Sequence, residues 1–363
     1  MNHSRRNGEI DLSRLGFSVM IAMHHIQLDF PQGVNAQGWI GVDFFFILSG
    51  FLMARHMYSH PLTGAADGAA IATETWRFIL GKIKSFYKYL LMGAFVQLIV
   101  RFILIKHIAA PKILRQFLTS LPNFSLIFMG LVGNSSVGHY VGNTWYLSSM
   151  IIAMFILYPM LLKGKSFSTR ILFPLLSVFG LALIYNNISF SAWKEWQGWT
   201  YWGNIRSVAE LALGASLYEL TDWLHWRDAQ TQRSKWMKLL CTAVKYASLL
   251  VIVAFGAGII SKSDAVHVVL YCALFILLSF SGLSYTIPGN RFTSYCGKIS
   301  LPIFIFHGII RHSFNEAIPN HEIGLPGFFA LVGLAVVLSV ALMYLTDTVA
   351  ALLKKRRRTG EAN

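Results

Sequence analysis

GVDFFFILSGFLMA, residues 41–54, decides the fold of this chain. The stretch carries a single charged residue, Asp43, and belongs to an apolar segment long enough to cross a bilayer as a helix. Comparable blocks recur along all 363 residues, which are 55% hydrophobic and only 13% charged. About a quarter of the residues are charged in a typical soluble domain. The sequence therefore predicts an all-α, polytopic membrane helix bundle embedded in the lipid bilayer.

Eleven apolar stretches are candidate spans, and 118–134 is the weakest because it contains Pro122, Asn123 and two glycines. Both ends of the chain are basic, and Lys and Arg collect on the cytoplasmic side of membrane proteins. Ten transmembrane helices with both termini cytoplasmic therefore fit best. Residues 1–352 would form the transmembrane domain and 353–363 a basic tail. The remaining candidates lie near residues 15–30, 38–54, 89–105, 144–162, 171–186, 204–220, 245–261, 265–283, 299–315 and 325–344.

Segments between the spans carry their own signals. Residues 74–88 predict an amphipathic helix on the cytoplasmic surface, apolar on one face with three basic residues on the other. The tryptophan-rich loop 186–203 is either an interfacial aromatic belt or a platform for sugar rings. Cytoplasmic loops account for the net charge of +15, so no nucleic-acid partner is expected. The three cysteines lack metal-ligand spacing, so no metal site is predicted.

Two histidines stand inside predicted spans, where an ionisable side chain costs a few kcal/mol. His25 follows Arg14 by eleven residues, or about 16 Å along a helix, and His307 follows Lys298 by nine, or about 13 Å. Both imidazoles should lie near the bilayer centre and stay neutral, so either can act as a general base. The alternative is a plain hydrogen bond to a neighbouring helix. His24, turned about 100° from His25, is expected to pack or to face lipid.

Other polar residues of the spans have two readings each. Asp43 either orients the imidazole of His25 or begins its own helix with a carboxylate. Ser49 and Gly50 either let two helices approach closely or make room for a thin ligand. Arg206 and Glu210 are four apart and predict an ion pair, read as structural rather than acceptor-binding. The motifs of serine hydrolases, zinc proteases and P-loop ATPases do not occur.

Three segments resemble the acyltransferase-3 family of integral-membrane acyltransferases: GEIDLSRLGFSVMIAMHH (8–25), GVDFFFILSGFLMA (41–54) and KISLPIFIFHGII (298–310). Two family segments differ here. The arginine-rich segment after the second helix is replaced by lysines in FILGKIKSFYKY (78–89), and WYLSSM (145–150) lacks the glutamate common at that place. The matching positions are Glu9, Asp11, Arg14, His25, Gly41, Asp43, Phe45, Phe46, Ser49, Gly50, Ser300 and His307.

The resemblance implies transfer of an acyl group, most often acetyl, from acyl-coenzyme A to a hydroxyl of a cell-surface glycan or glycolipid. It also implies a bacterial inner membrane as the location. His25 is then the general base or a transient acyl acceptor, with Arg14, Asp43 and His307 as further catalytic candidates. The polyanionic donor would bind in the cytoplasmic entrance, and no metal cofactor is expected. The donor-binding candidates are Arg14, Lys82, Lys84, Ser49 and Gly50.

Two other functions stay open at this stage. A glycan or lipid transporter could use the buried histidines as proton relays. A non-catalytic membrane assembly partner is the third possibility. Dependence on coenzyme A separates the acyltransferase from both.

Overall fold

The computed structural model describes residues 6–29, 35–62, 67–105, 111–112, 144–187, 196–197, 200–230, 234–261, 265–317 and 324–360. Ten helices of 15 residues or more occur within these ranges, so the predicted all-α bundle is confirmed. They are α1 (Gly8–Asp29), α2 (Ile40–Ser59), α3 (Gly68–Val96), α6 (Thr144–Lys163), α8 (Phe173–Asn187), α9 (Trp202–Gln230), α10 (Lys235–Gly256), α11 (Ala265–Phe280), α12 (Arg291–Ala317) and α13 (Leu325–Gly360).

Short elements join some of these helices. The π-helix η1 (Gln97–Ile105) continues α3, while α7 (Lys165–Phe167) and the π-helix η2 (Ser168–Leu172) precede α8. A two-residue hairpin, β1 (Trp196–Gln197) and β2 (Thr200–Tyr201), lies in the tryptophan-rich loop just before α9. The weak candidate span 118–134 lies outside the described residues.

Six stretches in the described part of the chain are long and apolar enough to cross a membrane. The long helices α1, α9 and α12 fall outside that set because they contain more charged and other polar residues, and α11 is short at 16 residues. The charged residues buried on α1 and α9 have partners inside the bundle: Glu9 pairs with Lys245 of α10, and Arg206 pairs with Asp43 of α2. The six stretches are Ile40–Ser59, Gly68–Val100, Trp145–Lys163, Lys165–Asn187, Lys235–Gly256 and Leu325–Lys355.

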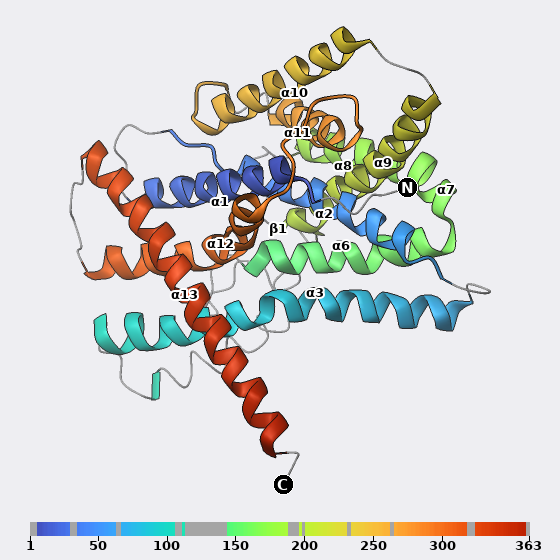
Figure 1. Cartoon of the computed structure of the whole chain (residues 1–363). Helices are drawn as coiled ribbons and strands as arrows, with labels where there is room; N and C mark the ends of the chain where they lie inside the picture. Colours follow the sequence, from blue (N-terminus) through green and yellow to red (C-terminus); the bar gives the residue numbers. More distant parts are fainter. Residues whose placement is uncertain are drawn as a thin grey trace.

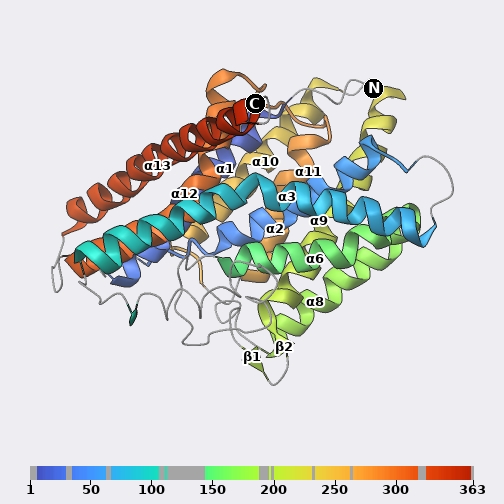
Figure 2. The same cartoon turned by 90° about the horizontal axis from the view of Figure 1, so that it is seen from below.

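The bundle is arranged around α1, α2 and α12. In Figure 1, α1 (dark blue) and α12 (orange) lie side by side, and α13 crosses the bundle obliquely before its carboxyl-terminal end extends beyond the other helices. The view turned by 90° shows α3 running the whole length of the molecule between α12 and α6 (Figure 2). An ion cluster fixes the oblique helix: Asp347 of α13 binds Lys88 of α3 at 2.6 Å and Lys298 of α12 at 2.9 Å.

The helix predicted over residues 74–88 is present, but it is the middle part of α3 and continues directly into the next apolar segment. Its place on the cytoplasmic surface stays a prediction. Asp67 caps the start of α3 by accepting a hydrogen bond from the backbone N–H of Ala70 at 2.7 Å. No proline follows within α3, and its buried positions continue through Phe86 and Leu90. The helix therefore runs on without a break from the basic segment into the apolar one.

Close packing of α2 against α9 depends on two glycines. A Cβ placed on Gly50 would lie 2.0 Å from the backbone oxygen of Leu211. A Cβ on Gly214 would lie 1.9 Å from the backbone oxygen of Ile47. Each glycine thus makes room for the backbone of the other helix, as small residues do where membrane helices cross.

Replacing Gly50 with alanine should therefore destabilise the protein by about 2 kcal/mol or more, because backbone on both helices must shift. Thermal unfolding in detergent measures the effect. Gly333→Ala is the matched control, since nothing lies within 4 Å of its added Cβ and alanine is the better helix former. Equal melting temperatures for the two variants would show that the α2–α9 crossing tolerates a wider spacing.

Candidate active site

The structure brings the two predicted histidines together. Their rings stack with centroids 5.2 Å apart and planes 23° apart. His307 is completely buried and His25 is half-buried. The pair arises because α1 and α12 run side by side in the same direction, with Arg6 near the start of α1 donating to the backbone oxygen of Ser294 near the start of α12 at 3.2 Å.

A backbone hydrogen bond determines which nitrogen of His307 carries the proton. Nδ1 of this ring lies 2.9 Å from the carbonyl oxygen of Ile303. A carbonyl oxygen only accepts hydrogen bonds, so Nδ1 must be the donor. In the neutral imidazole the lone pair then lies on Nε2, the nitrogen that could accept a proton from a hydroxyl. The hydrogen bond to Ile303 therefore leaves Nε2 as the basic nitrogen of His307.

His24 serves the structure of the neighbouring chain segment. Its Nδ1 lies 2.7 Å from the carbonyl oxygen of Ala36, and Gln27 both donates to that carbonyl and accepts from the backbone N–H of the same residue. These bonds tie the end of α1 to the start of the segment leading into α2. Of the two roles expected for His24, packing or a position facing lipid, these hydrogen bonds support the first.

Ion pairs fix the start of α1. Glu9 accepts a hydrogen bond from Lys245 of α10 at 2.8 Å, and both side chains are buried. Asp11 binds Arg6 and lies 3.6 Å from Arg14. The hydrogen bond from Arg6, which precedes the helix, to the Asp11 carboxylate raises the pKa of the guanidinium.

A glycine of α12 makes room for this arrangement. A Cβ on Gly297 would meet the Asp11 carboxylate at 2.1 Å, so only glycine lets α12 approach the start of α1 this closely. The acidic residues shared with the family thus anchor α1 and support Arg14 beside α12.

Arg14 opens onto a cavity of about 320 Å³ between α1, α2, α3, α6 and α12, which we name the inner cavity. Its cations are Arg14 and Lys82, and its hydroxyl groups come from Ser49, Ser85, Tyr146 and Ser300. Phenylalanine, leucine and methionine side chains form the rest of the wall. Its described lining contains two cations and no carboxylate, which suits an anionic ligand with an apolar arm.

A second cavity of about 620 Å³, the mouth cavity, adjoins the first. Lys82 and Ser85 line both, so the two cavities border the same turn of α3. His56 and His60 stack there with ring centroids 4.6 Å apart, and Arg77 pairs with Glu74. The mouth cavity is thus rich in nitrogen donors.

The remaining donor-binding candidates have different places. Lys84 is exposed and does not line the inner cavity, and Gly50 lies at the α2–α9 crossing. Gly50 allows the close helix approach that was one of the two predictions for the Ser49–Gly50 pair, while Ser49 lines the inner cavity and its role toward a ligand stays a prediction.

Asp43 belongs to a buried ion cluster. Arg206 of α9 donates to Asp43 Oδ1 at 2.7 Å through Nε and also binds Glu210 at 3.1 Å, and all three side chains are fully buried. The predicted Arg206–Glu210 pair is confirmed, and Asp43 joins it. The hydrogen bonds of Asp43 thus go to α9, whereas its sequence position next to the first span suggested a role beside His25.

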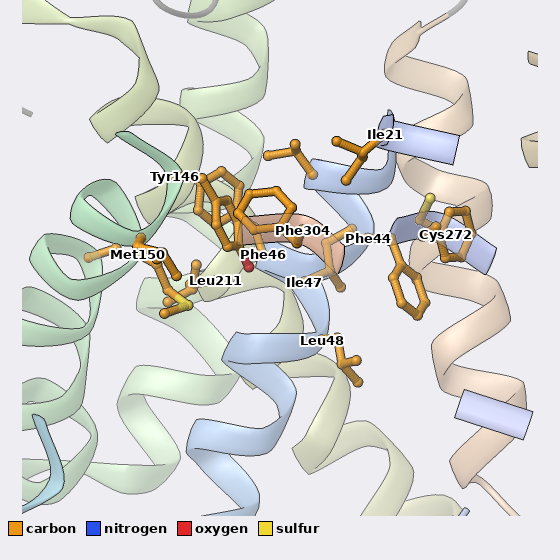
Figure 3. Packing of buried hydrophobic residues seen from close by; sticks show 14 of the residues in the cluster. Ile21, Phe44, Phe46, Ile47, Leu48, Tyr146, Met150, Leu211, Cys272 and Phe304 are labelled. Carbon is orange, nitrogen blue, oxygen red and sulfur yellow. The ribbon is translucent and has the colours of Figure 1, made fainter. Parts of the chain in front are cut away.

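Tyr146 is the residue of the inner cavity that sequence reasoning missed. It is buried at the start of α6 and its ring lies 5.1 Å from that of Phe304. Figure 3 shows the two rings next to each other near Phe46, while Phe44 lies on the other side of α2 toward Cys272. The available signal was its place in WYLSSM, the segment that differs from the family pattern.

Comparison with known proteins identifies a family. A family model described as an acyltransferase domain matches residues 7–344, nearly the whole chain. No curated protein and no solved structure matches significantly. Within the described residues, no group of three or more His, Cys, Asp or Glu side chains could hold a metal ion.

Replacing Arg206 with methionine should destabilise the protein by about 3–5 kcal/mol, because two buried carboxyl groups lose their cation. Chemical or thermal unfolding in detergent measures the loss. Arg170→Met removes the ion pair with Glu219 at a position where the arginine side chain is 65% exposed, and should change stability by less than about 1 kcal/mol. Similar losses in both variants would contradict a special role for the buried cluster.

Proposed function

The chain belongs to the acyltransferase family whose model spans it, and we propose that it transfers an acyl group, acetyl in the first instance, from acyl-coenzyme A to a hydroxyl of a cell-surface glycan or glycolipid. One observation carries this proposal. A cationic cavity that begins at Arg14 lies along the α1–α12 pair, and the stacked His25 and His307 lie further along the same two helices.

The two adjoining cavities suit the shape of coenzyme A. Its phosphates would lie in the mouth cavity and at Lys82, where cationic side chains bind phosphate by charge and hydrogen bonds. The narrow pantetheine arm would extend along the inner cavity past Arg14 and Ser49. Lys84, which is exposed on α3 and directly precedes Ser85, would add to the positive surface that attracts the donor.

Proton transfer in this reaction balances within the site. The acceptor oxygen attacks the thioester carbonyl carbon while its proton passes to the imidazole, His25 or the Nε2 of His307. The carbon–sulfur bond then breaks, and the imidazolium returns the proton to the leaving thiolate. The products are the glycan ester and free coenzyme A. In the alternative route, His25 attacks the thioester carbon, the carbon–sulfur bond breaks and the thiolate takes up the imidazole proton. The acceptor oxygen then attacks the acyl-histidine, its proton passes to His307, and the bond between the acyl carbon and His25 breaks.

A multi-pass protein of the bacterial inner membrane would receive the donor from the cytoplasm and the acceptor from the membrane or its outer side. Both termini would then lie in the cytoplasm. Asp43 would act at a distance from the chemistry, by holding α2 against α9 so that Ser49 stays in the cavity wall.

Removing either imidazole should lower acyl transfer by about 10²–10⁴-fold, the usual contribution of a general base. Radiolabelled acetyl-coenzyme A is supplied to membranes that contain wild type, His25→Ala or His307→Ala at matched protein amounts, and label in the glycan fraction is counted. His267→Ala, an exposed histidine on α11, is the control and should match the wild type.

Each pattern of labelling has a separate meaning. Full labelling by His25→Ala would remove that residue from the chemistry and leave His307 as the base. Labelling by neither the wild type nor any variant, in membranes that contain the acceptor glycan, would favour a transporter over an acyltransferase.

Donor binding is tested by charge removal. Arg14→Gln and Lys82→Gln should each weaken binding of acetyl-coenzyme A by about tenfold or more, the value of a charge-assisted hydrogen bond. Equilibrium binding to the purified full chain measures this. Lys84→Gln should change mainly the salt dependence of binding, and Lys235→Gln, exposed at the start of α10, should change neither. Unaltered affinity in both cavity variants would contradict the proposed donor site.

A further inference from the structure

Three aromatic rings meet in the part of the inner cavity that lies toward His307, since Phe304 is the last residue of α12 in the lining and the nearest to His307 along that helix. Phe45 of α2, Tyr146 of α6 and Phe304 of α12 all line the cavity. Their ring centroids lie 6.4 Å apart for Phe45 and Tyr146, 6.4 Å for Phe45 and Phe304, and 5.1 Å for Tyr146 and Phe304, each pair edge to face. Since every ring packs against the other two, we name the set the aromatic wall.

Phe304 lies between the cavity and the histidine pair. Its ring lines the cavity and also lies 6.2 Å from the ring of His307. Ser300, Phe304 and His307 follow one another at spacings of four and three residues, so they share one face of α12. From Phe304 to His307 the helix rises by only about 4.5 Å. A thioester carbonyl within reach of His307 must therefore lie at the aromatic wall.

The wall differs from the sides of the cavity in the kind of side chain that forms it. Phe304 and Tyr146 are each only 5% exposed, and their rings come from different helices and pack edge to face. The sides include Met150 and Met154, whose unbranched chains adapt to a ligand more readily than packed rings do. A long arm can thus be accommodated along the cavity, while the volume beyond the thioester is occupied.

We propose that the aromatic wall sets the size of the acyl group, with Phe304 as the specificity-determining residue. The inference rests on the proposed coenzyme A donor. Carbon atoms beyond the thioester carbonyl need the space that the three rings fill, so a two-carbon acyl group fits and a chain of six carbons does not. The preference lies in the aromatic wall and is separate from the cationic groups that hold the phosphates.

The test compares acyl-coenzyme A donors of different length on the purified full chain. Labelled acetyl-coenzyme A is displaced by unlabelled acetyl- or hexanoyl-coenzyme A, and the ratio of the two dissociation constants is measured. The wild type should favour acetyl by about tenfold or more, the discrimination that a fixed apolar wall gives. Phe304→Ala should reduce this ratio by about tenfold, and Phe304→Leu should reduce it less.

Phe306→Ala is the matched control. It removes a fully buried ring from the same helix, two residues away, where the ring packs against Tyr89 at 6.3 Å outside the cavity. This variant should keep the wild-type ratio of dissociation constants. If Phe304→Ala does not elute as a single species in size-exclusion chromatography, Phe304→Leu takes its place in the test.

The outcomes separate the two proposals. A wild-type ratio in both Phe304 variants, or equal affinity of the wild type for both donors, overturns the role of the aromatic wall while the donor assignment stands. Absence of acetyl-coenzyme A binding to the wild type overturns the donor assignment, and the wall proposal with it.

Discussion

The buried ion pair between Glu9 and Lys245 holds the first turn of α1 against α10, and the positions of all the site residues on α1 follow from it. A helix has a fixed rise, so once its first turn is anchored the depth of each later residue is determined. Slipping α1 by one turn would move Arg14 and His25 together by about 5.4 Å. Buried ion pairs contribute little net stability but strongly disfavour alternative registers. The pair therefore specifies position more than it stabilises the fold.

A second constraint acts on α2. The Asp43–Arg206–Glu210 cluster and the contacts of Gly50 and Gly214 both join α2 to α9. The glycines set the distance between the two helices, and the ion cluster sets their register. One face of α2 therefore packs against α9, and the neighbouring face, with Phe45 and Ser49, lines the inner cavity. The contacts of α2 with α9 thus determine which of its residues line the cavity.

Sequence alone predicted the helical elements and singled out Arg14, His25 and His307, because apolar length and rare polar groups in apolar segments are local signals. The continuity of α3 was missed. A basic segment next to an apolar one suggested two separate helices in two environments, whereas a single helix passes through both. The partner of Asp43 was also missed. Sequence spacing places a residue along its own helix but does not specify which helix lies opposite, so long-range pairs such as Asp43 with Arg206 need the tertiary structure.

The contact between the two histidines also could not be predicted from the sequence. His25 and His307 were each identifiable as unusual in a membrane span, but their separation of 282 positions in sequence contains no information about contact. Parallel packing of α1 and α12, supported by Asp11 against Gly297, brings them together. Tyr146 was harder to predict, because a tyrosine near the end of an apolar helix is common in membrane proteins.

One consequence of the unbroken α3 concerns movement. Lys82 and Ser85 lie within a single turn of this helix and border both cavities. A rigid helix cannot tilt at one of these residues without displacing the other. Any shift of α3 that widens the mouth cavity therefore alters the inner cavity at the same moment. For the donor proposed above, entry of the phosphates and fit of the pantetheine arm would then depend on the same position of α3.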